Sequence, residues 1–365
     1  EQTLILIKGA RGAGKTTLLL QRFAQQNEKA IYLSLDDFYF ETNRLLLLIE
    51  DLYTEGYTTF FLDEVHQYPH WSRDFKNIYD NFPEIKIVAT GSSALQIDKG
   101  IADLSRRMTV YKLHGLSFRE FIEFERGIYI PPISLKYLLE KHEKYSVLLN
   151  DLFNPLGYFE DYLKYGYYPF YQTDRKFYHQ KLQQTVQLTI DVDLPSVENL
   201  NFSSLRGMKK LLFILTQIVP YTPNIQSLAK KMGTPRNFVL RALDLLDRSD
   251  ILSLLRSETK GISYLQKPEK IYLNNPNLFF VFNDKSHNKG NLRETFFFNQ
   301  LKVKHEITAS KFGDFLVDQS FIFEVGGATK TNKQIAGIPT AYIAADDIKF
   351  GSKNKIPLYL FGFLY

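Results

Sequence analysis

The sequence predicts an α/β protein of several domains, whose first part is a parallel sheet with helices on both faces. The chain has 365 residues, which is long for a single hydrophobic core. Short apolar runs alternate with helical patterns over the first ~130 residues, and this alternation is typical of a parallel sheet. Pro131 and Pro132 then interrupt the pattern. We therefore expect an α/β domain over 1–130, a helical region over 131–206, a winged-helix-like domain over 207–283 and a second α/β domain over 284–365.

The composition indicates a folded protein that does not depend on disulfides. Hydrophobic residues make up 44% and aromatic residues 15% of the chain, which excludes a disordered chain. It has no cysteine, so neither a disulfide nor a cysteine-based zinc site can form. The formal net charge of +5 permits nucleic-acid binding without requiring it. No apolar run approaches ~20 residues and no secretory signal is visible, so we expect no membrane span and a cytoplasmic location. The chain starts at Glu1 and not at a methionine, and we expect a further segment upstream.

The first motif follows a short apolar run at 3–7 and precedes a helical pattern that starts at Thr17. Residues 9–16 read Gly-Ala-Arg-Gly-Ala-Gly-Lys-Thr, which is the phosphate-binding pattern G-x-x-x-x-G-K-[ST] in its expected strand–loop–helix context. Glycines let backbone N–H groups surround phosphate oxygens, and the helix N-terminus adds partial positive charge. Lysine would reach the β- and γ-phosphates, and the Thr16 hydroxyl would bind Mg²⁺. The residues expected to contact the nucleotide are Gly9, Arg11, Gly12, Ala13, Gly14, Lys15, Thr16 and Thr17.

Two acids follow a second apolar run, residues 58–62. Asp63 at the strand end is expected to hold Mg²⁺, and Glu64 is placed to orient or deprotonate the attacking water. The alternative for Glu64 is a solvated acid at the end of a strand. No Asn-Lys-x-Asp guanine-binding box appears near these residues, so ATP is preferred over GTP.

A third apolar run, residues 85–90, ends in small polar residues. Ser92 or Ser93 could contact the γ-phosphate or the water, although a plain helix cap is a close alternative. Arg107, downstream of this run, could neutralise charge in the transition state. The alternative is that Arg106 and Arg107 form a solvated surface pair.

The sequence pattern in the middle of the chain predicts three helices, over 208–219, 225–233 and 236–248. A pair of strands is predicted to follow, over 251–255 and 270–273. This is the order of a winged helix-turn-helix, whose third helix can enter the DNA major groove. Arg236, Asn237 and Arg241 would then face the nucleic acid. The acids Asp244, Asp247 and Asp250 on the same segment weaken that interpretation. The module also serves protein contacts, and we favour the structural interpretation.

Three acids in the last region have the order found in restriction-endonuclease-like folds. Glu294 lies at a helix start, Asp314 precedes a strand and Glu324 ends one, and such carboxylates can hold Mg²⁺. The lysine of the usual Glu-x-Lys pattern is replaced by Gly326, although Lys330 could move in from the next loop. We therefore favour a decayed nuclease fold that acts as a scaffold over an active nuclease. Two further strands are predicted, over 340–344 and 356–361.

These motifs together resemble AAA-type ATPases of the AAA_14/DUF4143 group. The resemblance is carried by GARGAGKTT (9–17), FFLDEVH (60–66), ATGSSALQI (89–97), LSRR (104–107) and LHGLSFREF (113–121), and more loosely by YLKYGYYPFY (162–171). It implies Mg²⁺-dependent ATP binding and hydrolysis coupled to a macromolecular partner, and it aligns Arg107 with an arginine of that family. Many such proteins form rings, so a homo-oligomer is an expectation as well. The alternatives are a nucleotide-gated switch that docks on DNA or a protein, and an ATP-coupled nuclease.

Overall fold

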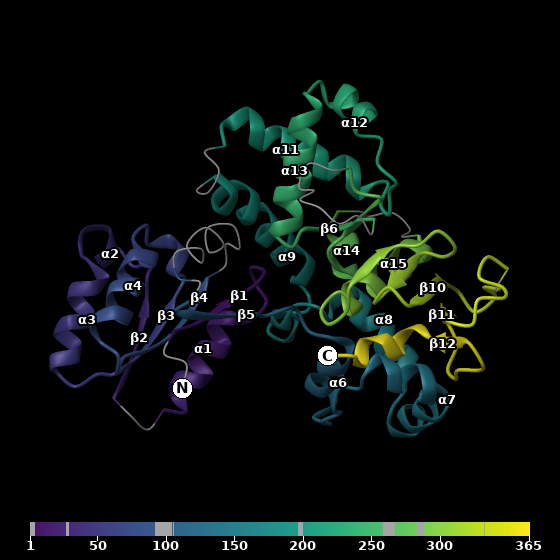
Figure 1. Ribbon diagram of the computed structural model, residues 1–365, viewed down its shortest axis with the longest axis horizontal. Helices are drawn as coiled ribbons and strands as arrows, with labels where there is room; N and C mark the ends of the chain where they lie inside the picture. The colour runs from purple at the N-terminus through teal and green to yellow at the C-terminus, as the bar shows by residue number, and fades with distance from the viewer. Residues whose placement is uncertain are drawn as a thin grey trace. The chain divides into compact units, whose positions relative to one another are not determined.

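The computed structural model describes residues 4–26, 29–91, 104, 106–195, 200–257, 267–282, 288–331 and 333–365 (Figure 1). The chain divides into two compact units. Unit 1 contains residues 1–115 and 187–201, and unit 2 contains residues 116–186 and 202–365. Within the described residues, no helix has both the length and the apolar character needed to cross a membrane. The finer division into four regions remains a prediction.

Unit 1 is built on a five-stranded sheet in the order β2-β3-β4-β1-β5 (Figure 1). All four pairings are parallel, which confirms the predicted sheet. Its strands are β1 (Leu4–Lys8), β2 (Ala30–Ser34), β3 (Thr59–Asp63), β4 (Lys86–Gly91) and β5 (Met108–Lys112). Its helices are α1 (Lys15–Ala24), α2 (Tyr39–Thr42), the 3₁₀ turn η1 (Val65–Gln67), α3 (Leu45–Thr54), α4 (Trp71–Asn81) and, on the returning segment, the π-helix η3 (Thr189–Asp193).

Helices cover both faces of this sheet, as the alternation of patterns predicts. On one face, α3 and α4 pack over a core that includes Leu6, Phe60 and Ile87. On the other face, α1 contributes Phe23, whose ring lies 5.6 Å from that of Phe61. Every residue of β3 is buried, which is expected of a parallel strand covered on both faces. Because the strands are parallel, their carboxyl ends meet at one edge, where ligands bind in such sheets.

Unit 2 begins with helices and ends with a mixed sheet. Its helices are α6 (Phe118–Arg126), α7 (Leu135–Leu152), α8 (Pro155–Tyr165), most of α9 (Tyr178–Leu188), α11 (Phe202–Thr216), α12 (Ile225–Met232), α13 (Arg236–Arg248), α14 (Phe279–Phe282) and α15 (Lys289–Leu301). Strands β6 (Leu252–Leu255) and β7 (Lys270–Leu273) form an antiparallel pair after α13. The helices and strands from 202 to 273 therefore follow the predicted order.

The C-terminal sheet has five strands in the order β12-β11-β10-β9-β8. They are β8 (Ile307–Ala309), β9 (Phe315–Val317), β10 (Phe321–Gly326), β11 (Ala341–Ala345) and β12 (Lys355–Pro357). The predicted strand over 356–361 is wrong beyond Pro357, because residues Leu358–Phe363 form a 3₁₀ helix. Pro357 has no N–H to continue a ladder, and the apolar residues after it are buried in this helical form.

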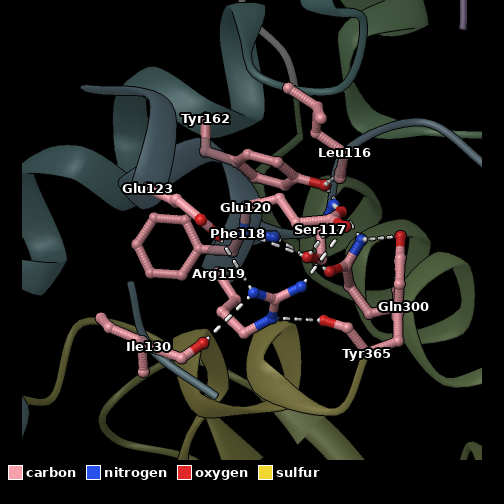
Figure 2. A network of polar contacts seen from close by, with 10 residues as sticks. All are labelled: Leu116, Ser117, Phe118, Arg119, Glu120, Glu123, Ile130, Tyr162, Gln300 and Tyr365. Atoms are coloured by element: carbon pink, nitrogen blue, oxygen red, sulfur yellow. Dashed lines mark hydrogen bonds and ion pairs between the residues drawn. The ribbon is translucent and has the colours of Figure 1, made fainter. Parts of the chain in front are cut away.

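A buried polar network ties the first helix of unit 2 to the end of the chain (Figure 2). Arg119 donates to the backbone carbonyls of Ile130 at 3.1 Å and Tyr365 at 2.8 Å. Gln300 on α15 donates to the Tyr162 hydroxyl at 2.9 Å. Buried polar groups that are satisfied in this way fix the packing of the elements that carry them. The LHGLSFREF motif therefore contributes its arginine to the frame of unit 2.

Candidate nucleotide site

The phosphate-binding loop lies between β1 and α1, and its backbone takes a form that glycine permits. Gly12 and Gly14 have φ angles of 84° and 97°, and Gly14 is the N-cap of α1. A Cβ atom at Gly9 would lie 2.1 Å from the carbonyl oxygen of Leu113, so that position accepts only glycine. Ala13 is buried, whereas Thr16 and Thr17 lie exposed in the first helical turn. Since the first N–H groups of a helix lack intrahelical acceptors, they are available to an anion.

Lys15 is held inside this loop. Lys15 is buried, with 5% exposure. Its ammonium donates to the carbonyl oxygens of Gly9 at 2.9 Å and Ala10 at 2.8 Å. These contacts aim a positive charge at the space that the loop encloses. The loop thus combines a fixed ammonium with a helix N-terminus, which is the arrangement that binds phosphates.

Asp63 ends β3 next to the loop and is buried, with 3% exposure. One carboxylate oxygen accepts from the Tyr32 hydroxyl at 3.0 Å, and the other accepts from the Thr90 hydroxyl. Burial, and then the hydrogen bond to Asp63, raise the pKa of Tyr32 to about 12. Both donors are neutral, so they orient the carboxylate without cancelling its charge. A buried carboxylate at the end of a parallel strand, together with the Thr16 hydroxyl, suits a Mg²⁺ ion and its waters.

Glu64 follows with a left-handed backbone, φ 51° and ψ 38°. This conformation is uncommon for residues other than glycine, and it is seen often at functional sites. The backbone N–H of Glu64 donates to Thr90 Oγ1 at 3.4 Å, and its carboxylate lies 3.4 Å from Nδ1 of His66. Burial lowers the pKa of His66 to about 4, so this imidazole is neutral at pH 7. The Glu64 carboxylate therefore lies beside a neutral imidazole.

The structure adds Asp193, a residue that was not predicted from the sequence. Its Oδ1 lies 3.2 Å from Nη2 of Arg11 in the loop, although the two residues are 182 positions apart. Burial raises the pKa of Asp193, and the nearby Arg11 opposes that rise. The sequence held one faint signal: Ile190, Asp193 and Leu194 have helical spacing and are all buried. An acid on the apolar face of a helix needs a partner, and here the partner belongs to the phosphate-binding loop.

Arg107 and Ser92 are the two residues predicted to contact the γ-phosphate. Arg107 makes two hydrogen bonds to Asp80, from Nε at 2.9 Å and from Nη2 at 3.2 Å. Ser92 lies outside the described residues, as does Ser93. The roles of Arg107 and Ser92 in binding the γ-phosphate therefore remain predictions.

In unit 2, the three acids of the predicted nuclease pattern lie together, and two lysines pair with them. The Lys270 ammonium is 2.7 Å from Oε2 of Glu294 and 3.8 Å from Oδ1 of Asp314. Lys330 Nζ is 2.6 Å from Oε1 of Glu324. Burial raises the pKa of Glu324, and its bond to Lys330 opposes that rise. We call these five residues the acid–lysine cluster.

Gly326 explains how Lys330 reaches this cluster. A Cβ atom at Gly326 would lie 2.8 to 2.9 Å from the Cβ, Cγ and Cδ atoms of Lys330. The glycine at the expected lysine position thus provides the space in which the stem of Lys330 lies. No group of three or more histidine, cysteine, aspartate or glutamate side chains within the described ranges is arranged to hold a metal ion.

The helices of the predicted DNA-reading module expose the residues singled out from the sequence. Arg236, Asn237 and Arg241 are all exposed on α13. Asp247 accepts a hydrogen bond from the backbone N–H of Leu254 at 3.2 Å, and burial raises its pKa to about 6. Asp247 therefore has a structural partner at the start of β6.

Comparisons with known proteins found one curated relative and several solved structures that resemble parts of this chain. A curated relative, "Uncharacterized protein MJ1637" of Methanocaldococcus jannaschii, is 27% identical over 294 residues, which is 74% of this chain and 60% of the relative. The Walker-type ATPase PABY2304 of Pyrococcus abyssi has a TM-score of 0.44 at 14% identity, covering 77% of this chain and 91% of that one. The RuvB Holliday junction branch migration motor of Thermotoga maritima has a TM-score of 0.31 at 15% identity, covering 70% and 82%.

The N-terminal part of the chain matches a family model. Residues 1–122 match the family described as AAA domain, and this range contains the phosphate-binding loop, Asp63 and Glu64. The motif at residues 9–16 lies between β1 and α1, which is the strand–loop–helix context that the phosphate-binding pattern requires. The match to the AAA_14 model therefore covers the N-terminal third of the chain, where the predicted nucleotide site lies.

Proposed function

We propose that this protein binds Mg²⁺·ATP at the carboxyl edge of the unit 1 sheet and hydrolyses it. The observation that carries the proposal is the buried Asp63 carboxylate, held by two hydroxyl groups and forming an ion pair with none of the described residues. Burying a charge without a counter-charge is costly, so such a site favours a cation. The loop that holds Lys15 supplies the complementary preference for phosphates.

Each residue then has one task. The backbone of residues 9–17 and the Lys15 ammonium bind the phosphates, while Thr16 and Asp63 hold Mg²⁺ directly or through its waters. Bound Mg²⁺ would neutralise charge on the β- and γ-phosphates. Glu64 orients the attacking water and takes its proton, a role that matches its strained backbone and its neutral neighbour His66. Arg107 and Ser92 are proposed to contact the γ-phosphate, and for Arg107 this requires that it leave Asp80.

The test is Mg²⁺-dependent phosphate release by wild type and by Glu64→Gln, with ATP binding measured in both. We expect turnover to fall at least ~100-fold in Glu64→Gln while ATP still binds, because removal of a general base costs about 10²- to 10⁴-fold. Glu55→Gln is the matched control, since Glu55 has an exposed side chain in the same unit. Unchanged turnover in Glu64→Gln, or a wild type that binds no ATP, would contradict the proposal. Binding without turnover in the wild type would leave a nucleotide-gated switch as the better account.

A second proposal concerns the macromolecular partner. Arg236 and Arg241 are exposed on α13, and the Asp247 carboxylate accepts a hydrogen bond from the backbone N–H of Leu254. We propose that this face docks on duplex DNA. The test is binding to a fluorescent duplex at several salt concentrations by wild type and by the double variant Arg236→Ala/Arg241→Ala, with Lys353→Ala as an exposed control. A smaller salt dependence in the double variant supports DNA, and equal binding by all three proteins excludes this face.

The acid–lysine cluster supports a structural role better than nuclease activity. Lys270 stands between Glu294 and Asp314, where a metal-dependent nuclease would need a divalent cation. Lys330 likewise neutralises Glu324. We propose that the two ammonium groups stabilise this part of unit 2 in place of a metal.

A further inference from the structure

The ion pair between Arg11 and Asp193 joins the phosphate-binding loop to a segment from far along the chain. We call residues 187–195 the returning segment. They belong to unit 1, although the chain on both sides, residues 116–186 and 202–365, belongs to unit 2. The returning segment contains the π-helix Thr189–Asp193, and its Ile190 and Leu194 are buried. It is thus a covalent route from the nucleotide site to unit 2.

The contact to Arg11 is a single one, and the guanidinium has further donors. Nη2 of Arg11 meets one oxygen of Asp193 at 3.2 Å, while Nε of Arg11 is buried and has no hydrogen-bond partner among the described residues. A guanidinium can instead make two parallel hydrogen bonds to a phosphate, with greater strength and specificity. Arg11 lies within the loop that is proposed to surround the phosphates. A phosphate at the loop is therefore the stronger partner for Arg11.

The charges around Asp193 also indicate that its pairing with Arg11 is sensitive to bound phosphate. Its residue is 4% exposed, and the negative charge of Glu64 is close enough to raise its pKa. The positive charges of Arg11 and His66 act in the opposite sense, but His66 is neutral at pH 7. Among the groups around Asp193, Arg11 makes the largest contribution that opposes the rise of its pKa. Phosphates at the loop would draw Arg11 away and add negative charge beside Asp193.

We propose that Asp193 is a nucleotide-sensing residue: the phosphates of a bound nucleoside triphosphate compete with its carboxylate for Arg11, and their binding releases the returning segment. This inference rests on the proposed nucleotide binding at the loop and adds how binding is transmitted. In this proposal Asp193 is a positioning residue that acts through Arg11.

The experiment is hydrogen–deuterium exchange on the full chain, with and without Mg²⁺ and a non-hydrolysable ATP analogue. We expect amides of residues 9–17 to become protected while exchange in residues 187–195 rises at least about fivefold. In Asp193→Asn the returning segment should exchange fast without nucleotide, and the analogue should bind about five- to tenfold more tightly because its competitor is gone. Asp191→Asn is the matched control, with an exposed side chain in the same π-helix, and should behave as wild type.

The outcomes separate this inference from the proposed function. Protection of residues 9–17 without faster exchange in 187–195 keeps nucleotide binding and overturns the sensing role. Weaker or equal binding of the analogue by Asp193→Asn also overturns it. If residues 9–17 gain no protection, both proposals fail. The wild-type comparison decides the question even where Asp193→Asn does not fold.

Discussion

The phosphate-binding site of unit 1 and the acid–lysine cluster of unit 2 use similar residues with opposite charge balance. In unit 1, the buried acid Asp63 is oriented by hydroxyl groups, and the ammonium of Lys15 is held by backbone carbonyls. In unit 2, Glu294 and Glu324 each lie within 2.7 Å of a lysine ammonium. A buried carboxylate that forms no ion pair with a described residue, as at Asp63, suits a cation, and charges that neutralise each other suit a structural role. Sequence motifs alone do not make this distinction.

The largest effect is expected from Lys15→Ala. Removing the ammonium leaves phosphate oxygens without their main cation, and truncation of a buried charged contact costs about 3 kcal/mol or more, which is at least ~100-fold in ATP affinity. Calorimetric titration with Mg²⁺·ATP measures this change. Lys29→Ala is the control, because its ammonium donates to the Glu55 carbonyl at an exposed position. ATP affinity within threefold of wild type in Lys15→Ala would contradict the assignment of the loop.

Acid is expected to destabilise unit 1 through His66. The pKa of His66 is lowered to about 4 in the folded chain, so the unfolded state binds more protons between pH ~4 and ~6.5. The contribution of His66 to the free energy of unfolding is therefore fully present above pH ~6.5 and is lost as pH falls. We expect the free energy of unfolding to decrease by about 2 kcal/mol from pH 7 to pH 5. Urea unfolding followed by the fluorescence of Trp71, the single tryptophan and a buried residue of unit 1, measures it.

His66→Gln should lose this part of the pH dependence, while His70→Gln, which changes an exposed histidine, should keep it. In unit 2, Asp247 gives a pH dependence of stability with the opposite sign, because its pKa is raised to about 6. Its contribution to stability is present at pH ~4 and is lost as pH rises through ~6. Equal pH dependence in wild type and His66→Gln would show that His66 is not a neutral buried group.

Arg107→Ala tests whether this arginine has a role beyond its ion pair. We expect turnover to fall about tenfold, because charge on the γ-phosphate loses a partner. The unfolding free energy should change by less than about 1 kcal/mol, since the pair with Asp80 is largely exposed. Phosphate release is compared with that of Arg106→Ala, its exposed neighbour. Equal turnover in the two variants would leave Arg107 with its surface ion pair alone.

The smallest effect is expected from Lys330→Ala. Glu324 is buried, and the loss of its cation raises its pKa further. The variant is therefore less stable at alkaline pH, where folding requires an ionised Glu324. Because Lys330 is partly exposed, we expect a loss of about 1 kcal/mol at pH 8 and little change at pH 4. Urea unfolding at both pH values measures the loss, with Lys333→Ala as the exposed control. A loss of the same size at both pH values would point to packing and not to charge.

Local patterns predicted the parts of the molecule that local chemistry determines. The loop at 9–16, the buried acid at the end of β3 and the helix over 236–248 follow from glycine conformations, strand ends and periodic apolar residues. Pro357 shows a limit of the same reasoning, because an apolar run continues beyond it in a different conformation. Periodicity does not distinguish a buried strand from a buried 3₁₀ turn over so few residues.

The remaining features depend on contacts between distant residues. Asp193 reaches Arg11 only because the chain returns to unit 1 after residue 186, and no spacing rule contains that return. Lys270 lies on β7, outside the region that held the three acids, and was therefore not associated with them. Lys330 was foreseen as a substitute for the missing lysine, and the room left by Gly326 supplies the physical reason.

The most direct test of the contrast between the two sites is to count bound Mn²⁺ by electron paramagnetic resonance. The measurement is made with and without ATP, in wild type and in two variants, Asp63→Asn and Asp314→Asn. The account predicts no tightly bound Mn²⁺ without nucleotide and one Mn²⁺ per chain with it, weakened by Asp63→Asn and unchanged by Asp314→Asn. Mn²⁺ that binds without nucleotide and disappears in Asp314→Asn would contradict the account, because it would make the acid–lysine cluster a metal centre.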